Sequence, residues 1–201
     1  MNPTLPFDYA SAWQYALTRL ETELPPELSY HSASHTRDDV VPATEMLAAL
    51  ENVSGVDRYL LLTAAWYHDL GYIEDCAAHE AASARLAAAI LPQFGYRPAD
   101  IQIVSTLIMA TKLPQSPQTL LERIIADADL DSLGREDFWP LSKALRAELI
   151  AMGNDIPMRE WLERQILFLR QHRYFTTAAQ KLRRSGKQKN IAFLKAKLAD
   201  L

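Results

Sequence analysis

The chain has 201 residues, of which 49% are hydrophobic and 23% are charged. Such a length suits one domain with a single core, and the composition is that of a folded globular protein rather than a disordered or fibrous one. A formal net charge of −4 provides no general basic face, so neither nucleic acid nor an anionic membrane is an expected partner. We expect one domain over residues 1–201.

The cysteine content and the N-terminal sequence predict a cytoplasmic protein. Cys76 is the single cysteine, so the chain can form neither an internal disulfide nor a Cys-x-x-Cys pair for zinc or redox chemistry. Residues 1–8 lack the basic and apolar regions of a secretion signal, and no run of about 18 uncharged apolar residues occurs. We therefore expect neither secretion nor a membrane span.

The first part of the chain has helical periodicity. Apolar residues in 13–24 recur at steps of three and four after Asp8, which predicts a capped helix that Pro25-Pro26 stops. A second helix is predicted to begin at Ser34 or His35 and to reach about residue 52, with a kink at Pro42.

Residues 56–70 are apolar on nearly every side of a helix, which predicts a central buried helix with Gly71 as its C-terminal cap. No alternating strand pattern or hairpin signal follows, so we predict an all-α fold, a single compact bundle. Gly134 is expected to break the chain between helices. The remaining predicted helices cover residues 77–91, 98–112, 117–130, 138–152, 157–174 and 176–201.

The most informative polar feature is the pair His68-Asp69, at the end of the most hydrophobic predicted helix. Burying an ionised carboxylate beside an imidazole is costly unless another group compensates. A divalent cation compensates directly, because it binds neutral imidazole and carboxylate together. On this interpretation the pair needs further ligands from elsewhere in the chain.

Two other polar residues extend the pattern, His35 before the doublet and Asp127 on a later predicted helix. A His, then a His-Asp doublet, then an Asp resembles the HD superfamily of metal-dependent phosphohydrolases, and further motifs resemble a stand-alone bacterial subgroup of it. The resemblance implies that His35, His68, Asp69 and Asp127 bind one cation. The further motifs are Tyr30-His31-Ser32, Ala64-Ala65-Trp66-Tyr67-His68-Asp69-Leu70-Gly71-Tyr72, His79-Glu80-x-x-Ser83 and Asp127-Ala128-Asp129-Leu130-x-x-Leu133-Gly134.

The last ligand comes from an acidic segment that offers three carboxylates, Asp127, Asp129 and Asp131. Asp127 is preferred because it matches the motif, and Asp129 is the alternative. Asp131 is expected to lie in a solvated turn.

The donor set contains nitrogen and oxygen but no sulfur, which suits Mn, Fe, Co, Ni, Mg or Zn without selecting among them. Such an ion lowers the pKa of a bound water and polarises phosphorus. The implied reaction is hydrolysis of a phosphomonoester or phosphodiester, with a small phosphorylated molecule, a nucleotide among the candidates, as substrate.

Other polar residues lie near these motifs in sequence but are not fixed there by spacing. Asp69, Glu74, Asp75 and His79 are candidate catalytic residues. Acidic residues directly after the doublet activate water or position substrate in other branches of the superfamily, whereas here Tyr72 precedes Glu74 and Asp75. This departure weakens any specific nucleotide-hydrolase assignment. His79 could instead be a capping or surface residue.

His31 and Lys112 are candidate substrate-binding residues, although a lysine in the last turn of a helix is ordinarily explained by the helix dipole and solvent. The predicted C-terminal helix is basic, which fits either a rim that attracts phosphate or a solvated helix face. Its basic residues are Lys181, Arg183, Arg184, Lys187, Lys189, Lys195 and Lys197.

Three alternatives remain open. An HD-type di-iron oxygenase needs extra ligands, for which His79 and His31 are the spare histidines before Asp127. A nucleotide-binding sensor domain would have the same ligands with little turnover, and a purely structural helical protein would carry the doublet by chance. Formation of a homo-oligomer is also left open.

Overall fold

A computed structural model describes residues 5–201; the first four residues, which the single-domain prediction includes, lie outside this range. Over the described range the chain forms nine α-helices and no β-strand, which confirms the all-α prediction. The helices are α1 (Tyr9–Glu23), α2 (Val41–Leu50), α3 (Gly55–Tyr67), α4 (His79–Ile90), α5 (Pro98–Met109), α6 (Leu120–Asp129), α7 (Phe138–Ala151), α8 (Met158–Gln171) and α9 (Thr177–Ala199).

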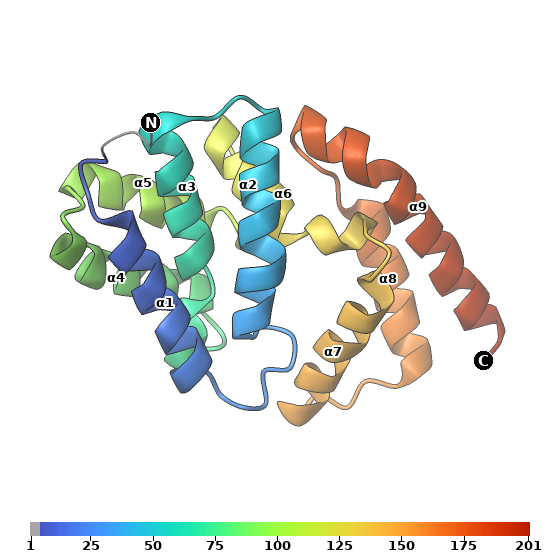
Figure 1. Cartoon of the computed structure of the whole chain (residues 1–201). Coiled ribbons are helices and arrows are strands. Elements are labelled where there is room, and N and C mark those ends of the chain that lie inside the picture. The colour runs from blue at the N-terminus through green and yellow to red at the C-terminus, as the bar shows by residue number, and fades with distance from the viewer. Residues whose placement is uncertain (1–4) are drawn as a thin grey trace.

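The helices are arranged in two groups on either side of α2 and α6 (Figure 1). On one side α3 packs against α1, α2 and α5, and α4 packs against α5. On the other side α7, α8 and α9 extend away from this group, with α9 packed along α8. The helix pair α2 and α6 is therefore the region where the two groups meet.

Helix α3 lies at the centre of the fold because its sequence leaves it no polar face. Every residue from Leu60 to Tyr67 is buried, which confirms the prediction of a central buried helix. The first helix is also as predicted: the Asp8 carboxylate accepts a hydrogen bond from the Ser11 amide at 3.0 Å, and α1 ends at Glu23 before the two prolines. A helix that is apolar on all sides, as α3 is from Leu60 to Tyr67, is stable only when other helices surround it.

The predicted second helix consists of two parts. Residues His35–Val40 form a π-helical segment, in which the Val41 amide donates to the Thr36 carbonyl, and α2 follows directly. Pro42 lies in the first turn of α2 and has no N–H to donate back to residue 38 of the preceding turn. The wider turn accommodates the proline, and His35 is the first residue of this segment.

Two hydrophobic clusters fill the interior of the described chain. The larger one gathers side chains of α1 to α6, whereas the smaller one lies among α7, α8 and α9. Helix α9 contributes Ala178 and Ala179 to the larger cluster and Ile191 and Leu194 to the smaller one. A shared helix is consistent with one domain, which remains a prediction. Among the described helices none is both long and apolar enough to cross a bilayer.

Two glycines let α9 approach the turn that follows α6. This turn is the 3₁₀ segment Asp131–Gly134, and a Cβ at Gly186 would overlap the backbone carbonyl of Gly134. A Cβ at Gly134 would in turn lie 2.5 Å from the Arg183 carbonyl oxygen. The predicted chain break at Gly134 is thus also a helix contact that has no room for a side chain.

We predict that Gly186→Ala destabilises the protein although it lies inside a helix. Alanine at an exposed helix position normally adds about 1 kcal/mol relative to glycine, but the new methyl here would separate α9 from the 131–134 turn. The expected loss of unfolding free energy is about 2 kcal/mol, measured by urea denaturation.

The matched control is Ser185→Ala, one residue earlier and exposed, which should change the stability by less than about 0.5 kcal/mol. A Gly186→Ala protein as stable as the wild type would mean that the close helix contact is absent.

Candidate metal centre

The ends of three helical segments bring four of the polar side chains together. His35 begins the π-helical segment, His68 and Asp69 directly follow α3, and Asp129 is the last residue of α6. We call these four residues the His-Asp cluster. Three of them, His35, His68 and Asp129, each offer a ligand atom within 4.8 Å of the other two, an arrangement that can hold a metal ion.

Both imidazoles direct Nε2 toward the carboxylates. His68 Nε2 lies 3.2 Å from Asp69 Oδ2 and 3.5 Å from Asp129 Oδ1. His35 Nε2 lies 3.5 Å from Asp129 Oδ1 and 3.9 Å from Asp69 Oδ2. These distances are too long for strong direct hydrogen bonds, and both carboxylates lie within 4 Å of both Nε2 atoms.

The opposite sides of the two rings are held by other groups. His68 Nδ1 lies 2.8 Å from the Ala65 carbonyl oxygen, so this nitrogen carries a proton and Nε2 is the nitrogen that can bind a metal ion. His35 Nδ1 faces Asp39 Oδ2 at 3.7 Å, and Arg135 pairs with the other Asp39 oxygen at 2.5 Å. Such carbonyl and carboxylate partners typically orient metal-binding histidines.

Burial leaves several of these atoms without partners. His68 is 1% exposed and Asp69 is 3% exposed. Within the described residues, His35 Nε2, His68 Nε2 and Asp69 Oδ2 have no hydrogen-bond partner, although buried polar atoms nearly always have one. A cation bound between them would satisfy all three atoms, and the set of two imidazoles with two carboxylates fits a divalent ion.

The electrostatics of the cluster also favour positive charge. Burial opposes an imidazolium at His35, but Asp129 and Asp39 outweigh it and raise the pKa of His35 to about 9. The pKa of His68 is raised in the same way by Asp69 and Asp129 against the effect of burial. Burial opposes ionisation of Asp69, yet His68 holds the pKa of that carboxyl well below its usual range. The carboxylates thus create a negative potential that stabilises a cation.

Asp127 is buried on a different side of α6. Its carboxylate accepts hydrogen bonds from the Phe175 amide at 2.8 Å, the Thr176 amide at 2.8 Å and the Thr176 hydroxyl at 2.7 Å. Burial outweighs these three bonds and raises the pKa of Asp127. Residues two apart on a helix point about 200° away from each other, so Asp127 and Asp129 cannot both face the two imidazoles.

The structure therefore brings Asp129 into the cluster, whereas the sequence analysis preferred Asp127 as the ligand. The expectation for Asp131 was wrong: it is 2% exposed rather than solvated, and its carboxylate pairs with Arg183 Nε at 2.6 Å. Of the three carboxylates in this segment, Asp129 belongs to the cluster. Asp131 binds Arg183 of α9, and Asp127 binds the residues just before α9.

The turn after the doublet is fixed by α4. The Gly71 amide donates to the Ser83 hydroxyl at 2.7 Å, and this hydroxyl donates to the His68 carbonyl at 2.6 Å. Gly71 was expected to cap the preceding helix, but α3 ends at Tyr67 and Gly71 lies in the following 3₁₀ turn. Glycine is required there because a Cβ would collide with the backbone of His79 and Ser83.

Three stacked rings, those of His31, Tyr72 and His79, lie beside the cluster. The Tyr72 ring is stacked between His31, at 4.5 Å between ring centroids, and His79, at 4.0 Å. His79 Nε2 is 3.8 Å from Asp69 Oδ1, and the His31 and His35 rings are 6.0 Å apart. The candidate substrate-binding residue His31 and the candidate catalytic residue His79 therefore lie near the cluster.

The position of His31 depends on a residue far along the chain. Glu148 of α7 lies with Oε1 2.5 Å from His31 Nδ1, and its Oε2 accepts hydrogen bonds from the amides of Tyr30 and His31. Burial opposes ionisation of Glu148, but the bond to His31 keeps the pKa of the carboxyl below its usual value. The sequence analysis did not identify Glu148, since a single acidic residue on a helix gives no signal.

The other candidates have different partners. The exposed Glu74 pairs with Arg85 at 2.6 Å, and Asp75 accepts hydrogen bonds from the amides of residues 77 and 78 ahead of α4. Exposed Lys112 lines a separate cavity together with Met109 and Leu113. None of these three pairs with a residue of the His-Asp cluster in the described part of the chain.

Part of the sequence and the fold are similar to those of known proteins. The model of a family described as HD domain matches residues 40–132, so this segment is an HD domain, the family that the sequence motifs resembled. A crystal structure of a predicted HD superfamily hydrolase from an uncultured Thermotogales bacterium has a TM-score of 0.60 to this chain at 20% identity. That similarity covers 94% of this chain and 91% of the other, and it shows a shared fold. No curated protein matches the sequence.

We predict that Asp127→Ala lowers the stability through the start of α9. The substitution leaves the part-buried Phe175 amide and the buried amide and hydroxyl of Thr176 without their acceptor, which should cost about 2–4 kcal/mol in urea denaturation. Asp155→Ala is the control, because that residue is exposed and has no side-chain hydrogen bond among those described. Equal stability of the two variants would contradict a structural role for Asp127.

Proposed function

We propose that this HD-domain protein is a hydrolase that uses one divalent metal ion to cleave a phosphoester of a small molecule. The observation that carries the proposal is the convergence of buried, unpartnered His35 Nε2, His68 Nε2 and Asp69 Oδ2 beside Asp129. Unpaired buried atoms are destabilising by themselves, and their retention at one point is typical of a binding site.

His35, His68, Asp69 and Asp129 would hold the ion, with Asp129 in the position for which the sequence favoured Asp127. When bound, such an ion supplies a lowered pKa for a water molecule and a Lewis acid for a phosphoryl oxygen. Two imidazoles and two carboxylates suit several ions, from Mn to Zn, so the donor set does not select the metal.

The residues beside the cluster would act on the substrate. His79 lies on the Oδ1 side of Asp69, so its imidazole is available to contact a phosphoryl oxygen. Glu148 fixes Nδ1 of His31, which leaves the other ring nitrogen free for a substrate group. With Nδ1 donating to Glu148, the remaining nitrogen of His31 donates a hydrogen bond when the ring is an imidazolium, and in that form it suits an anionic substrate.

Metal content tests the ligand assignment. We expect one divalent ion per chain in the wild type by elemental analysis after dialysis against Mn²⁺, and loss of the ion in His68→Ala and Asp129→Ala. Asp127→Ala, if folded by circular dichroism, should keep the ion because its carboxylate faces Thr176. Retention by Asp129→Ala with loss by a folded Asp127→Ala would restore the original assignment.

Activity tests the reaction. In a screen of phosphomonoesters and phosphodiesters, nucleotides included, we expect Mn²⁺-dependent release of phosphate or alcohol that a chelator abolishes. Asp69→Asn should lower kcat/KM by about 100-fold or more, and Asp155→Ala should leave it unchanged. A protein that holds one metal ion but hydrolyses no member of the screen would contradict the proposal, and two irons per chain without hydrolysis would favour an oxygenase.

A further inference from the structure

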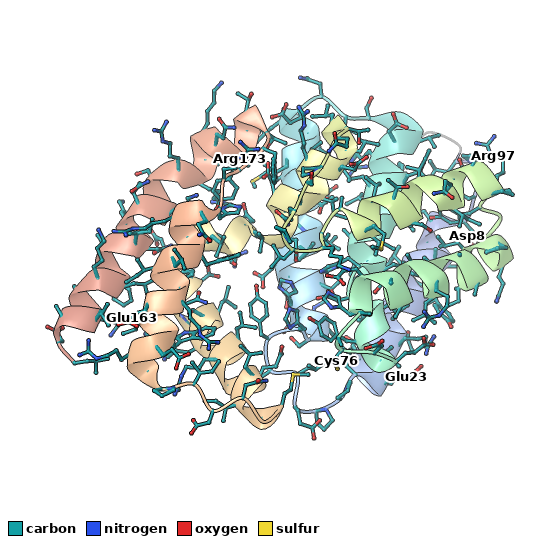
Figure 2. The ribbon with its side chains drawn as sticks, turned by 180° about the vertical axis from the view of Figure 1, so that it is seen from behind. Asp8, Glu23, Cys76, Arg97, Glu163 and Arg173 are labelled. Carbon is teal, nitrogen blue, oxygen red and sulfur yellow. The ribbon has the colours of Figure 1, made fainter. Side chains whose placement is uncertain are left out.

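Two cavities adjoin each other near the junction of α6, α8 and α9, and neither includes a residue of the His-Asp cluster. One has a volume of about 400 Å³ and the other about 370 Å³. Gln115, Arg173 and Phe175 line both cavities, so the two are neighbours, and together they are called the recess. Figure 2 shows Arg173 on the chain that enters α9. Either volume is within the range of ordinary small-molecule pockets.

One half of the recess is positively charged. Arg123 and Arg173 both line it, and neither forms an ion pair among the described residues. No aspartate or glutamate lines either half. Two exposed guanidinium groups that pair with no carboxylate attract a compact anion such as a phosphate.

The other half is apolar and aromatic. Phe168, His172 and Phe175 line it together with Leu113, and the Arg173 guanidinium lies 5.8 Å from the centre of the Phe175 ring. Burial and the nearby Lys187 lower the pKa of His172 to about 4, so its ring is uncharged at neutral pH. Uncharged aromatic rings beside a guanidinium plane provide stacking surfaces for a flat heterocycle.

Hydrogen bonds hold the walls of the recess in place. Gln115 donates to the Ala126 carbonyl of α6 at 3.0 Å, and the Phe175 amide donates to Asp127 at 2.8 Å. Gln180 donates to the Tyr174 carbonyl at 3.0 Å. The recess is therefore largely formed before any ligand binds, which lowers the entropic cost of binding.

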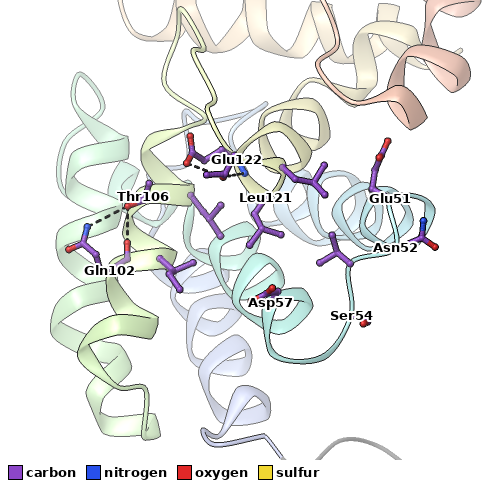
Figure 3. A pocket seen from close by; sticks show the side chains of 13 residues that line it. Glu51, Asn52, Ser54, Asp57, Gln102, Thr106, Leu121 and Glu122 are labelled. Atoms are coloured by element: carbon purple, nitrogen blue, oxygen red, sulfur yellow. Dashed lines mark hydrogen bonds between the residues drawn. The ribbon is translucent and has the colours of Figure 1, made fainter.

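A third cavity has the opposite charge pattern. It has a volume of about 640 Å³ and lies among α2, α3, α5 and α6, with Glu51, Asp57 and Glu122 in its lining (Figure 3). No basic residue lines it. An anion would be repelled there, whereas the recess at Arg123 and Arg173 attracts it.

We propose that the recess between α6, α8 and the start of α9 is a binding site for a mononucleotide, separate from the His-Asp cluster. The phosphate lies between Arg123 and Arg173, and the base lies against Phe168 and Phe175. The ligand must combine an anionic group with a flat ring, because one half of the recess is positively charged and the other half is aromatic.

Isothermal titration of the full-length protein tests the site. The probe is an analogue of AMP in which a methylene group replaces the ester oxygen, so that the protein cannot hydrolyse it. We expect saturable binding that weakens by about 10-fold or more in Arg123→Ala and in Arg173→Ala, since each loses a charge-assisted contact. Ribose 5-phosphate should bind at least about 10-fold more weakly than the probe, because it has no base to stack.

Two controls separate this site from the metal centre. Arg170→Ala removes an equal charge from the exposed face of α8 without changing the recess, so it should bind as the wild type does. His68→Ala, if folded by circular dichroism, should also bind normally. Loss of binding in His68→Ala with retention in both arginine variants, equal affinity for ribose 5-phosphate, or no binding of the probe at millimolar concentration would each overturn the proposal.

Discussion

The structure depends on a concentration of buried charge at the point where α3, α6 and the π-helical segment meet. Two carboxylates and two imidazoles lie there with little access to water, and several of their atoms lack partners. Such an arrangement is unfavourable unless a cation, or protons on the imidazoles, balances it. The surrounding features, from the Ala65 carbonyl to Asp39 and Arg135, hold the rings in the orientation that this balance requires.

Much of this arrangement was predictable because the signals are local. The uninterrupted apolar run before His68 predicted a buried helix, and the doublet at its end predicted a charged site in the interior. The prolines at 25 and 26 predicted the end of the first helix region correctly. Short-range steric and hydrophobic rules govern these features, and the sequence displays such rules directly.

The parts that sequence did not predict depend on which side of a helix a residue faces in the folded chain. Asp127 and Asp129 are chemically identical, and the choice between them depends on where the Thr176 amide and hydroxyl lie. The same applies to Glu148 and Asp39, whose roles depend on contacts with His31 and His35. His35 also lies outside residues 40–132, which the family model matches, so the cluster includes a residue that this match does not contain.

The hydrogen bonds that Asp127 accepts from Phe175 and Thr176 connect α6, at the centre of the protein, to the segment that leads into α9. Without the donors at Phe175 and Thr176, a buried carboxylate would remain unpaired two residues before Asp129. Because an unpaired buried charge is costly, α6 would rotate until the Asp127 carboxylate reached water. The same rotation would move Asp129 away from the imidazoles. Shortened chains that end before Phe175 should therefore fail at the metal centre first, although every proposed ligand would still be present in them.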